Sequence, residues 1–148
     1  MSKGIFVAIE QRGGIVQKVS IELLGEARRL SGQLGEDVTA VLMGSGVSHL
    51  SEMLIQYGAD HVLVVDHPVL EHYTTEPYTK AMTHVIHTYG PNIVMFGATS
   101  IGRDLAPRVA SRIHTGLTAD CTSLAIEEES KLLLMTRPAF GGNIMATI

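Results

Sequence analysis

The chain has 148 residues, of which 45% are apolar, and its formal net charge is −4 at pH 7 with the histidines neutral. This length and composition suit one globular domain, and the acidic balance with scattered cations argues against nucleic-acid binding, which favours a clustered basic face. No apolar run approaches about 18 residues, so we expect no membrane span. The N-terminus lacks the pattern of a signal peptide, and a lone Cys121 fits a reducing compartment, so we expect a cytoplasmic protein.

Four short runs rich in β-branched residues alternate with segments whose apolar residues recur with the period of a helix. This alternation predicts an α/β fold with a mostly parallel sheet and helices on both faces. All four runs are nearly continuously apolar, as is typical of strands buried on both faces. The predicted strands are residues 5–9, 38–42, 62–65 and 93–96.

The four predicted helices carry apolar side chains at spacings of three and four residues. We expect the second helix to stop at Gly58 and the third at Gly90, which is followed by a proline. In the fourth, Pro107 is expected in the opening turn, where a helix tolerates proline. The predicted N-caps of the first three are Ser20, Ser48 and Thr75.

The last part of the chain changes to a strand pattern without helices. Residues 123–127 and 132–136 predict an antiparallel hairpin, and Gly141 and Gly142 lead into a third run at 143–148. Because the chain stops inside that apolar run, we expect it to be a fragment, one domain of a longer protein.

A glycine-rich turn follows the second predicted strand. Gly44-Ser45-Gly46 opens a helix and Asp66 ends the next strand, as in a dinucleotide fingerprint, but His49 stands where the third glycine belongs. The pattern also follows the second strand rather than the first. It therefore favours a tight strand-to-helix turn over NAD binding.

Other reactive side chains form no recognisable site. His84 and His87 flank an apolar stripe, and with His72 they lack further ligands at zinc spacing, so surface or half-buried positions are expected. Cys121 has no histidine at catalytic spacing and is expected to be a small core residue at a strand start. No catalytic nucleophile or general base is identified.

Two segments have the chemistry of a binding loop. Residues 97–108 follow the fourth strand at the carboxyl edge of the sheet, where Gly97, Gly102 and a helix N-terminus could face a ligand. In the alternative hypothesis, Asp104 caps the helix or pairs with Arg108, and the loop serves packing alone. Arg137 precedes Pro138, which biases it to an extended backbone and aims its guanidinium. The guanidinium of Arg137 is suited to bind an anion or an aromatic ring system, or else to pair with a nearby glutamate.

Three stretches, GATSIGRDLAPR (97–108), TGLTADC (115–121) and TRPAFGGNIMA (136–146), occur in an order and spacing that resemble the N-terminal domain of the electron-transfer flavoprotein α subunit. The opening strand at 6–10 is similar to that of the same family, so the resemblance covers essentially residues 1–148. It implies a fold of the adenine nucleotide α-hydrolase-like group, to which the strand pattern at 123–148 adds a C-terminal antiparallel extension. It also implies that a C-terminal FAD-binding domain lies beyond Ile148.

The resemblance implies a scaffold that binds no nucleotide of its own and packs against a β subunit as a heterodimer. It implies flavin dehydrogenase partners such as acyl-CoA dehydrogenase and, for the electron-bifurcating type of anaerobes, ferredoxin and NADH. In that type a second FAD lies in the β subunit, and Arg137 matches an arginine near its reactive ring edge. The expected interface or loop residues are Thr99, Ser100, Gly102, Arg103, Gly141 and Gly142.

Two alternatives stand beside this hypothesis. The loop at 97–108 and the turn at 44–46 also fit a free-standing nucleotide-binding domain of the universal stress protein or ATP α-hydrolase type. The second alternative, a metal-dependent hydrolase, is supported by the histidines alone.

Overall fold

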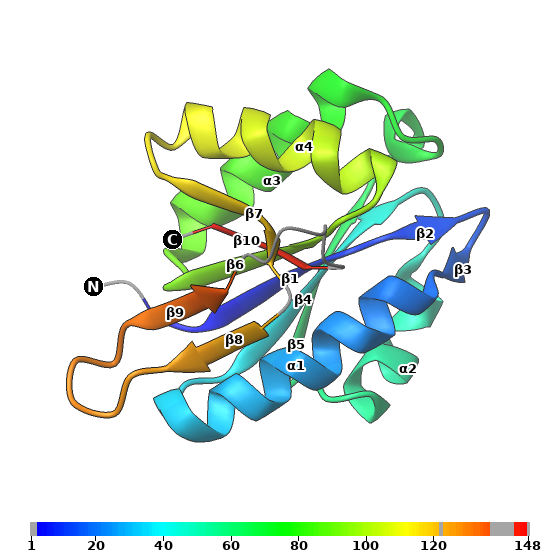
Figure 1. The fold of residues 1–148 in the computed structure, drawn as a ribbon. Helices are drawn as coiled ribbons and strands as arrows, with labels where there is room; N and C mark the ends of the chain where they lie inside the picture. The colour runs from blue at the N-terminus through cyan, green and yellow to red at the C-terminus, as the bar shows by residue number, and fades with distance from the viewer. Residues whose placement is uncertain (1–2, 122, 137–143, 148) are drawn as a thin grey trace.

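The computed structural model describes residues 3–121, 123–136 and 144–147. Its centre is a six-stranded sheet with the order β5-β4-β1-β6-β10-β7, and helices lie on both faces (Figure 1). The α/β class and the layered arrangement predicted from the sequence are thereby confirmed.

Four parallel strands form the main part of the sheet: β1 (Ile5–Ile9), β4 (Val38–Gly44), β5 (His61–Asp66) and β6 (Ile93–Gly97). Every residue of β1, β4 and β6 is buried, which explains their continuous apolar runs. The expectation of burial on both faces is wrong for β5, which is an edge strand with a partly exposed surface. An apolar run alone does not distinguish an edge strand from a central one.

The C-terminal strands divide between two sheets. β8 (Ser123–Ile126) and β9 (Leu133–Thr136) form the predicted antiparallel hairpin. β7 (Leu117–Cys121), which the sequence pattern missed, joins the main sheet, and β10 (Ile144–Thr147) lies antiparallel between β6 and β7. The chain thus returns after the hairpin to fill a gap in the sheet.

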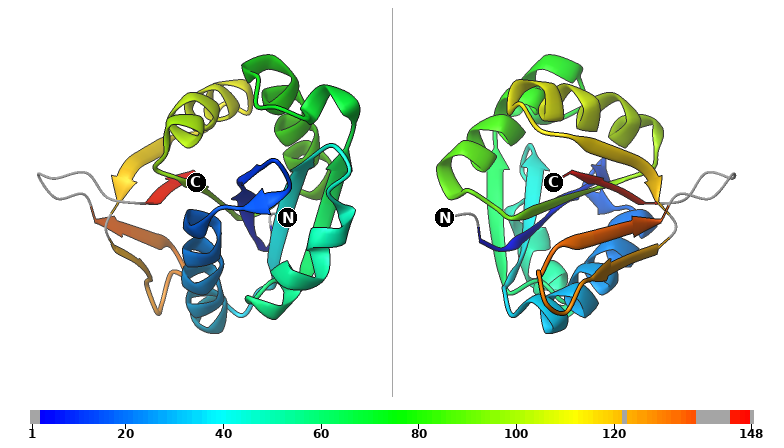
Figure 2. Two further views of the ribbon diagram at one scale, coloured as in Figure 1. Left: turned by 90° about the vertical axis from the view of Figure 1, so that its right-hand side faces the viewer. Right: turned by 60° about the vertical axis from the view of Figure 1, so that its left-hand side comes forward.

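The helices divide into two layers. α1 (Lys18–Leu34) and α2 (Ser51–Gln56) cover one face together with the β8–β9 hairpin, whereas α3 (Thr75–Tyr89) and α4 (Ser100–Arg112) cover the other (Figures 1 and 2). Each layer encloses its own apolar cluster. Leu24 and Leu124 belong to the first, and Met82 and Val109 to the second.

The predicted helix stripes lie on the packed faces of the helices except at Tyr57 and Tyr89, which are exposed, and several helix starts are wrong. α1 is capped at Gln17 and buries Ser20, and α3 is capped at Thr74 rather than Thr75. The segment after Val47 begins with a 3-10 turn (η1, Ser48–Leu50). α4 begins at Ser100, so Pro107 lies well inside the helix, on its exposed side, and not in the opening turn.

Shorter elements complete the chain. A small hairpin of β2 (Gln11–Arg12) and β3 (Ile15–Val16) follows β1, and a second 3-10 turn, η2 (Pro68–Leu70), follows β5. Gly90 takes a left-handed backbone (φ 61°) and ends α3 as predicted. Within the part of the chain that is described, no helix combines the length and apolar character that crossing a bilayer requires.

Candidate functional site at the carboxyl edge of the sheet

The carboxyl ends of β1 and β6 mark the place where this fold class binds ligands. From β1 the chain first builds β4 and β5 on one side, and then crosses to build β6 on the other. Open α/β sheets bind ligands in the crevice outside the strands at such a reversal. Glu10 follows β1 here, and Gly97 ends β6 and leads to α4. The expected binding loop therefore lies at the expected point of the fold.

Thr99 accepts hydrogen bonds from the backbone N–H groups in the first turn of α4. Its hydroxyl oxygen accepts a hydrogen bond from the Gly102 N–H (3.0 Å), and its carbonyl accepts one from the Arg103 N–H (2.8 Å). The same hydroxyl donates to the Glu10 carboxylate (2.5 Å). Thr99 is therefore the N-cap of α4, a role that the sequence prediction considered for Asp104.

The two glycines of this loop are explained by packing. A Cβ at Gly102 would lie 1.7 Å from the carbonyl oxygen of Gly97, and one at Gly97 would lie 2.9 Å from Val19. Close backbone approach was predicted here, but the backbone being approached is the chain's own. The glycines bring α4 directly onto the end of β6.

Glu10 occupies the space between the two strand ends. Its backbone is fixed to the start of α1, because the Gln17 N–H donates to the Glu10 carbonyl (2.9 Å) and the Glu10 N–H donates to the Ser20 hydroxyl (2.7 Å). Burial raises the pKa of the Glu10 carboxyl, while the hydrogen bond from Thr99 and the charge of Arg12 oppose that shift. This half-buried carboxyl was not singled out by the sequence, where it reads only as the polar residue after a strand.

The crevice beside Glu10 is nearly full. The cavity that remains has a volume of about 20 Å³, room for about one water molecule and too small for a nucleotide. Its lining is mainly apolar and aromatic: Met43, Tyr73, Tyr78, Phe96, Ile101 and Leu105. The crevice thus resembles a ligand site in position but is closed by the chain's own side chains.

Asp66 fills a second anion-binding position, at the glycine-rich turn after β4. Its carboxylate accepts hydrogen bonds from the Gly46 N–H (2.9 Å), the Val47 N–H (3.2 Å) and the Ser48 hydroxyl (3.4 Å). These bonds, led by that from Gly46, lower the pKa of Asp66. A phosphate would compete with this carboxylate for the same donors. The predicted tight strand-to-helix turn is present here.

Asp104 connects α4 to the segment before α3. It accepts hydrogen bonds from the hydroxyls of Tyr73 (2.6 Å) and Thr75 (2.7 Å), and these bonds lower the pKa of Asp104. Burial raises the pKa of Tyr73, and its hydrogen bond to Asp104 raises it further. Arg108 approaches Asp104 at 3.9 Å and Glu76 at 3.9 Å. The predicted pair of Asp104 with Arg108 is thus present, although the shorter contacts are those to Tyr73 and Thr75.

The remaining expected site residues lie on the first turn of α4 or outside the described part. Ser100 and Arg103 are exposed on the first turn of α4, and Gly102 is buried beneath them. Arg137, Gly141 and Gly142 lie outside the described residues, so their expected roles stay predictions.

The predicted histidine positions agree with the structure. His72, His84 and His87 are exposed, and no cluster of three or more His, Cys, Asp or Glu in the described part could hold a metal ion. Cys121 ends β7, so the prediction that it starts a strand is wrong. The segment was read as a loop because its glycine and polar residues hid the strand.

A family model described as "Electron transfer flavoprotein domain" matches residues 5–148. The chain is similar to an electron transfer flavoprotein subunit alpha of Thermoanaerobacterium thermosaccharolyticum, at 58% identity over 99% of this chain and 44% of the relative. It is 45% identical to the lactate dehydrogenase (NAD(+),ferredoxin) subunit LctC of Acetobacterium woodii, over 99% of this chain and 35% of that subunit.

A further relative is the acryloyl-CoA reductase electron transfer subunit beta of Anaerotignum propionicum, at 42% identity over 99% of this chain and 46% of the relative. The chain therefore spans less than half the length of each of these relatives.

Proposed function

Because the chain belongs to the electron transfer flavoprotein domain family and is an α-type member, we propose that it is the N-terminal scaffold and β-subunit docking domain of a flavin-containing electron carrier. The FAD of the α subunit binds in a C-terminal domain beyond residue 148. The carrier passes electrons between dehydrogenases and a redox acceptor in the cytoplasm.

The observation that carries this proposal is the closed crevice. A domain that bound its own nucleotide would need an open carboxyl edge and free N–H donors. Here Glu10 and Thr99 close the crevice, and Asp66 takes the donors of the Gly46 turn. The crevice and the turn therefore do not fit FAD or another nucleotide. This also weighs against a free-standing nucleotide-binding domain of the universal stress protein type.

The names of the relatives support the choice of electron partners. One relative is a subunit of a lactate dehydrogenase that uses NAD(+) and ferredoxin, and another is an electron transfer subunit of acryloyl-CoA reductase. We propose by analogy that this carrier serves a flavin dehydrogenase and bifurcates electrons from NADH, with ferredoxin as one acceptor. That reaction requires a second FAD in the β subunit.

The flavin content of the full complex tests the carrier and its type. The longer protein containing this domain would be purified with its β subunit, and FAD and AMP would be counted after denaturation. We expect two FAD molecules per heterodimer. One FAD with one AMP would contradict bifurcation but retain simple electron transfer, and a complex without flavin would contradict the carrier itself.

Calorimetry tests the scaffold role. Residues 1–148 titrated with ATP, AMP or FAD should show no binding tighter than about 1 mM, or about −4 kcal/mol. Micromolar binding of any of the three would contradict a scaffold and favour the nucleotide-binding alternative.

A further inference from the structure

We infer that the cleft between α3 and η2 is a binding site for a small amphipathic anion, a single carboxylate head with a linear apolar chain. The cleft has a volume of about 640 Å³, within the range of about 300–1,000 Å³ that is usual for small-molecule sites. The inference goes beyond the proposed docking role and does not depend on it.

Most of the cleft is lined by apolar side chains. They come from three elements: Val65 from β5, Val69 and Leu70 from η2, and Pro77 and Ala81 from α3. Pro77 and Ala81 are four residues apart, so they lie on the same face of the helix. Val69 is 53% exposed although it borders the cleft. An apolar chain that covers Val69 removes this surface from water, which favours binding.

The cleft also contains hydrogen-bond donors that lack a partner. Lys80 and His84 line it from one face of α3, and neither side chain pairs with another residue in the described part of the chain. His67 lines it as well, and the Nδ1 atom of its ring accepts a hydrogen bond from the Val69 N–H (3.1 Å). A neutral imidazole that accepts at Nδ1 carries its proton on Nε2 and can donate there. An ammonium and two imidazoles can therefore hold a negatively charged head.

The carboxylate of Glu76 also lines the cleft, but its charge is already matched. Arg112 lies 2.6 Å from one of its oxygens, and Arg108 lies 3.9 Å from the other. Arg108 also lies 3.9 Å from Asp104, so these two arginines balance two carboxylates. Lys80 then remains as one unbalanced positive charge beside the cleft. Charge complementarity favours a head with one negative charge over a phosphate or a nucleotide.

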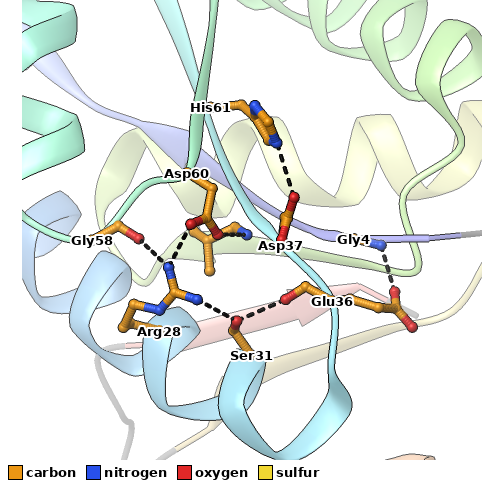
Figure 3. Close-up of polar contacts among 9 residues, drawn as sticks. Gly4, Arg28, Ser31, Glu36, Asp37, Gly58, Asp60 and His61 are labelled. Atoms are coloured by element: carbon orange, nitrogen blue, oxygen red, sulfur yellow. Dashed lines mark hydrogen bonds and ion pairs between the residues drawn. The ribbon is translucent and has the colours of Figure 1, made fainter.

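A second cleft, at the amino end of β5, is similar in size but differs in charge. Its volume is about 670 Å³, and two carboxylates, those of Asp37 and Asp60, line it. Figure 3 shows that both have partners: the Asp37 carboxylate lies 3.0 Å from the His61 ring, and Arg28 donates to Asp60 (2.9 Å). A ligand carboxylate would meet like charges there. The charge of the lining residues therefore selects the cleft between α3 and η2.

Octanoate binding to the longer protein that contains this domain tests the inference. Calorimetry should show saturable binding with a dissociation constant below about 1 mM. From butanoate to octanoate, the affinity should rise by about two- to fourfold for each methylene, because burial of a methylene contributes up to about fourfold. Octanol has the same chain without the charge and should bind at least about threefold more weakly. Equal affinities for octanoate and octanol, or no saturable octanoate binding up to about 10 mM, would overturn the inference.

A matched pair of lysine variants locates the head of the ligand. Lys80→Gln removes the unbalanced charge and should weaken octanoate binding about three- to fivefold. Lys3→Gln is the control, because Lys3 is an exposed lysine that lines the second cleft, and its affinity should stay within about twofold of the wild type. Equal affinities in the two variants would contradict the assignment of the head to Lys80.

A second pair of variants, at Val69, tests the cleft itself. Val69→Asp places a carboxylate beside the bound anion and should weaken octanoate binding at least about tenfold. Val69→Asn has a similar size but no charge and should weaken it about threefold, through the lost apolar contact. Val69 is exposed, so both variants should fold, which thermal midpoints check. Wild-type affinity in both variants would place octanoate elsewhere and overturn the inference.

These outcomes are separate from those of the proposed function, because octanoate binding requires neither the β subunit nor a redox reaction. Octanoate binding that Val69→Asp abolishes supports the inference even if the two subunits do not associate. If octanoate does not bind and Val69→Asp instead weakens association with the β subunit or with a second copy, the cleft is a protein contact. That result would overturn the inference and leave the proposed function intact.

Discussion

Glu10 is the residue whose chemistry depends most on its surroundings. Its carboxyl lies half-buried between two strand ends, and burial raises its pKa above the ordinary value of 4.5. The folded protein therefore binds this proton more tightly than the unfolded chain does. It follows that stability falls as pH rises from about 4.5 through the raised pKa.

Glu10→Gln should remove this pH-dependent loss. The amide keeps an oxygen that can accept the hydrogen bond from Thr99 but carries no charge. We expect stability at pH 7 to rise by up to about 1 kcal/mol, with a flatter profile between about pH 4.5 and 7. Urea unfolding at several pH values measures both effects. A parallel profile for the two proteins would contradict this account of Glu10.

Gly102 shows how a glycine can be required without a ligand. Gly102→Ala would place a Cβ 1.7 Å from the Gly97 carbonyl oxygen, so α4 would have to move. We expect a loss of about 3 kcal/mol or more. Gly32→Ala is the matched control: Gly32 lies in α1 with nothing within 4 Å of the added Cβ. That change should stabilise by about 0.5–1 kcal/mol, as measured by thermal or urea unfolding.

At the scale of elements, the helix N-terminus of α4 depends on one side chain. Thr99→Ala removes the cap on Gly102 and the bond to Glu10, and should cost about 1–2 kcal/mol. Thr99→Ser keeps the hydroxyl and should cost less than half as much. If both substitutions destabilise equally in urea unfolding, the methyl group, not the cap, is what matters.

Sequence patterns predicted the elements better than their ends. The apolar runs and stripes located the four parallel strands and four helices, because their burial follows directly from periodicity. The start of α4 was missed because its first turn contains few apolar residues, although Thr99 is a good N-cap. The position of β10 could not be predicted, since its neighbours β6 and β7 are distant in the sequence and local patterns do not encode pairing.

The location of the candidate site was predicted from the sequence, but its closed state was not. Gly97 and Gly102 correctly indicated the carboxyl edge of the sheet. That the edge is closed depends on Glu10 meeting Thr99, a contact between residues 89 positions apart. Asp66 likewise meets the Gly46 turn only in the folded chain. Such contacts decide between a ligand site and a packed turn, and a motif alone cannot show them.

At the scale of the whole molecule, Arg137 is the residue predicted to affect electron transfer. Arg137→Ala in the full complex should shift the redox behaviour of the β-subunit flavin and leave heterodimer assembly intact, because a nearby cation stabilises an anionic flavin. Arg137→Lys, which keeps the charge, should shift it less. Spectroelectrochemical titration measures the potentials, and unchanged values in both variants would contradict the predicted contact.

The account as a whole treats this domain as a docking scaffold that leaves flavin binding to other domains. Sedimentation of residues 1–148 with the β subunit, followed by protein and visible flavin absorbance, tests that claim most directly. We predict that the domain alone carries no flavin and that it sediments together with the β subunit as a one-to-one complex. A domain that sediments separately from the β subunit, or that carries stoichiometric flavin by itself, would contradict the account.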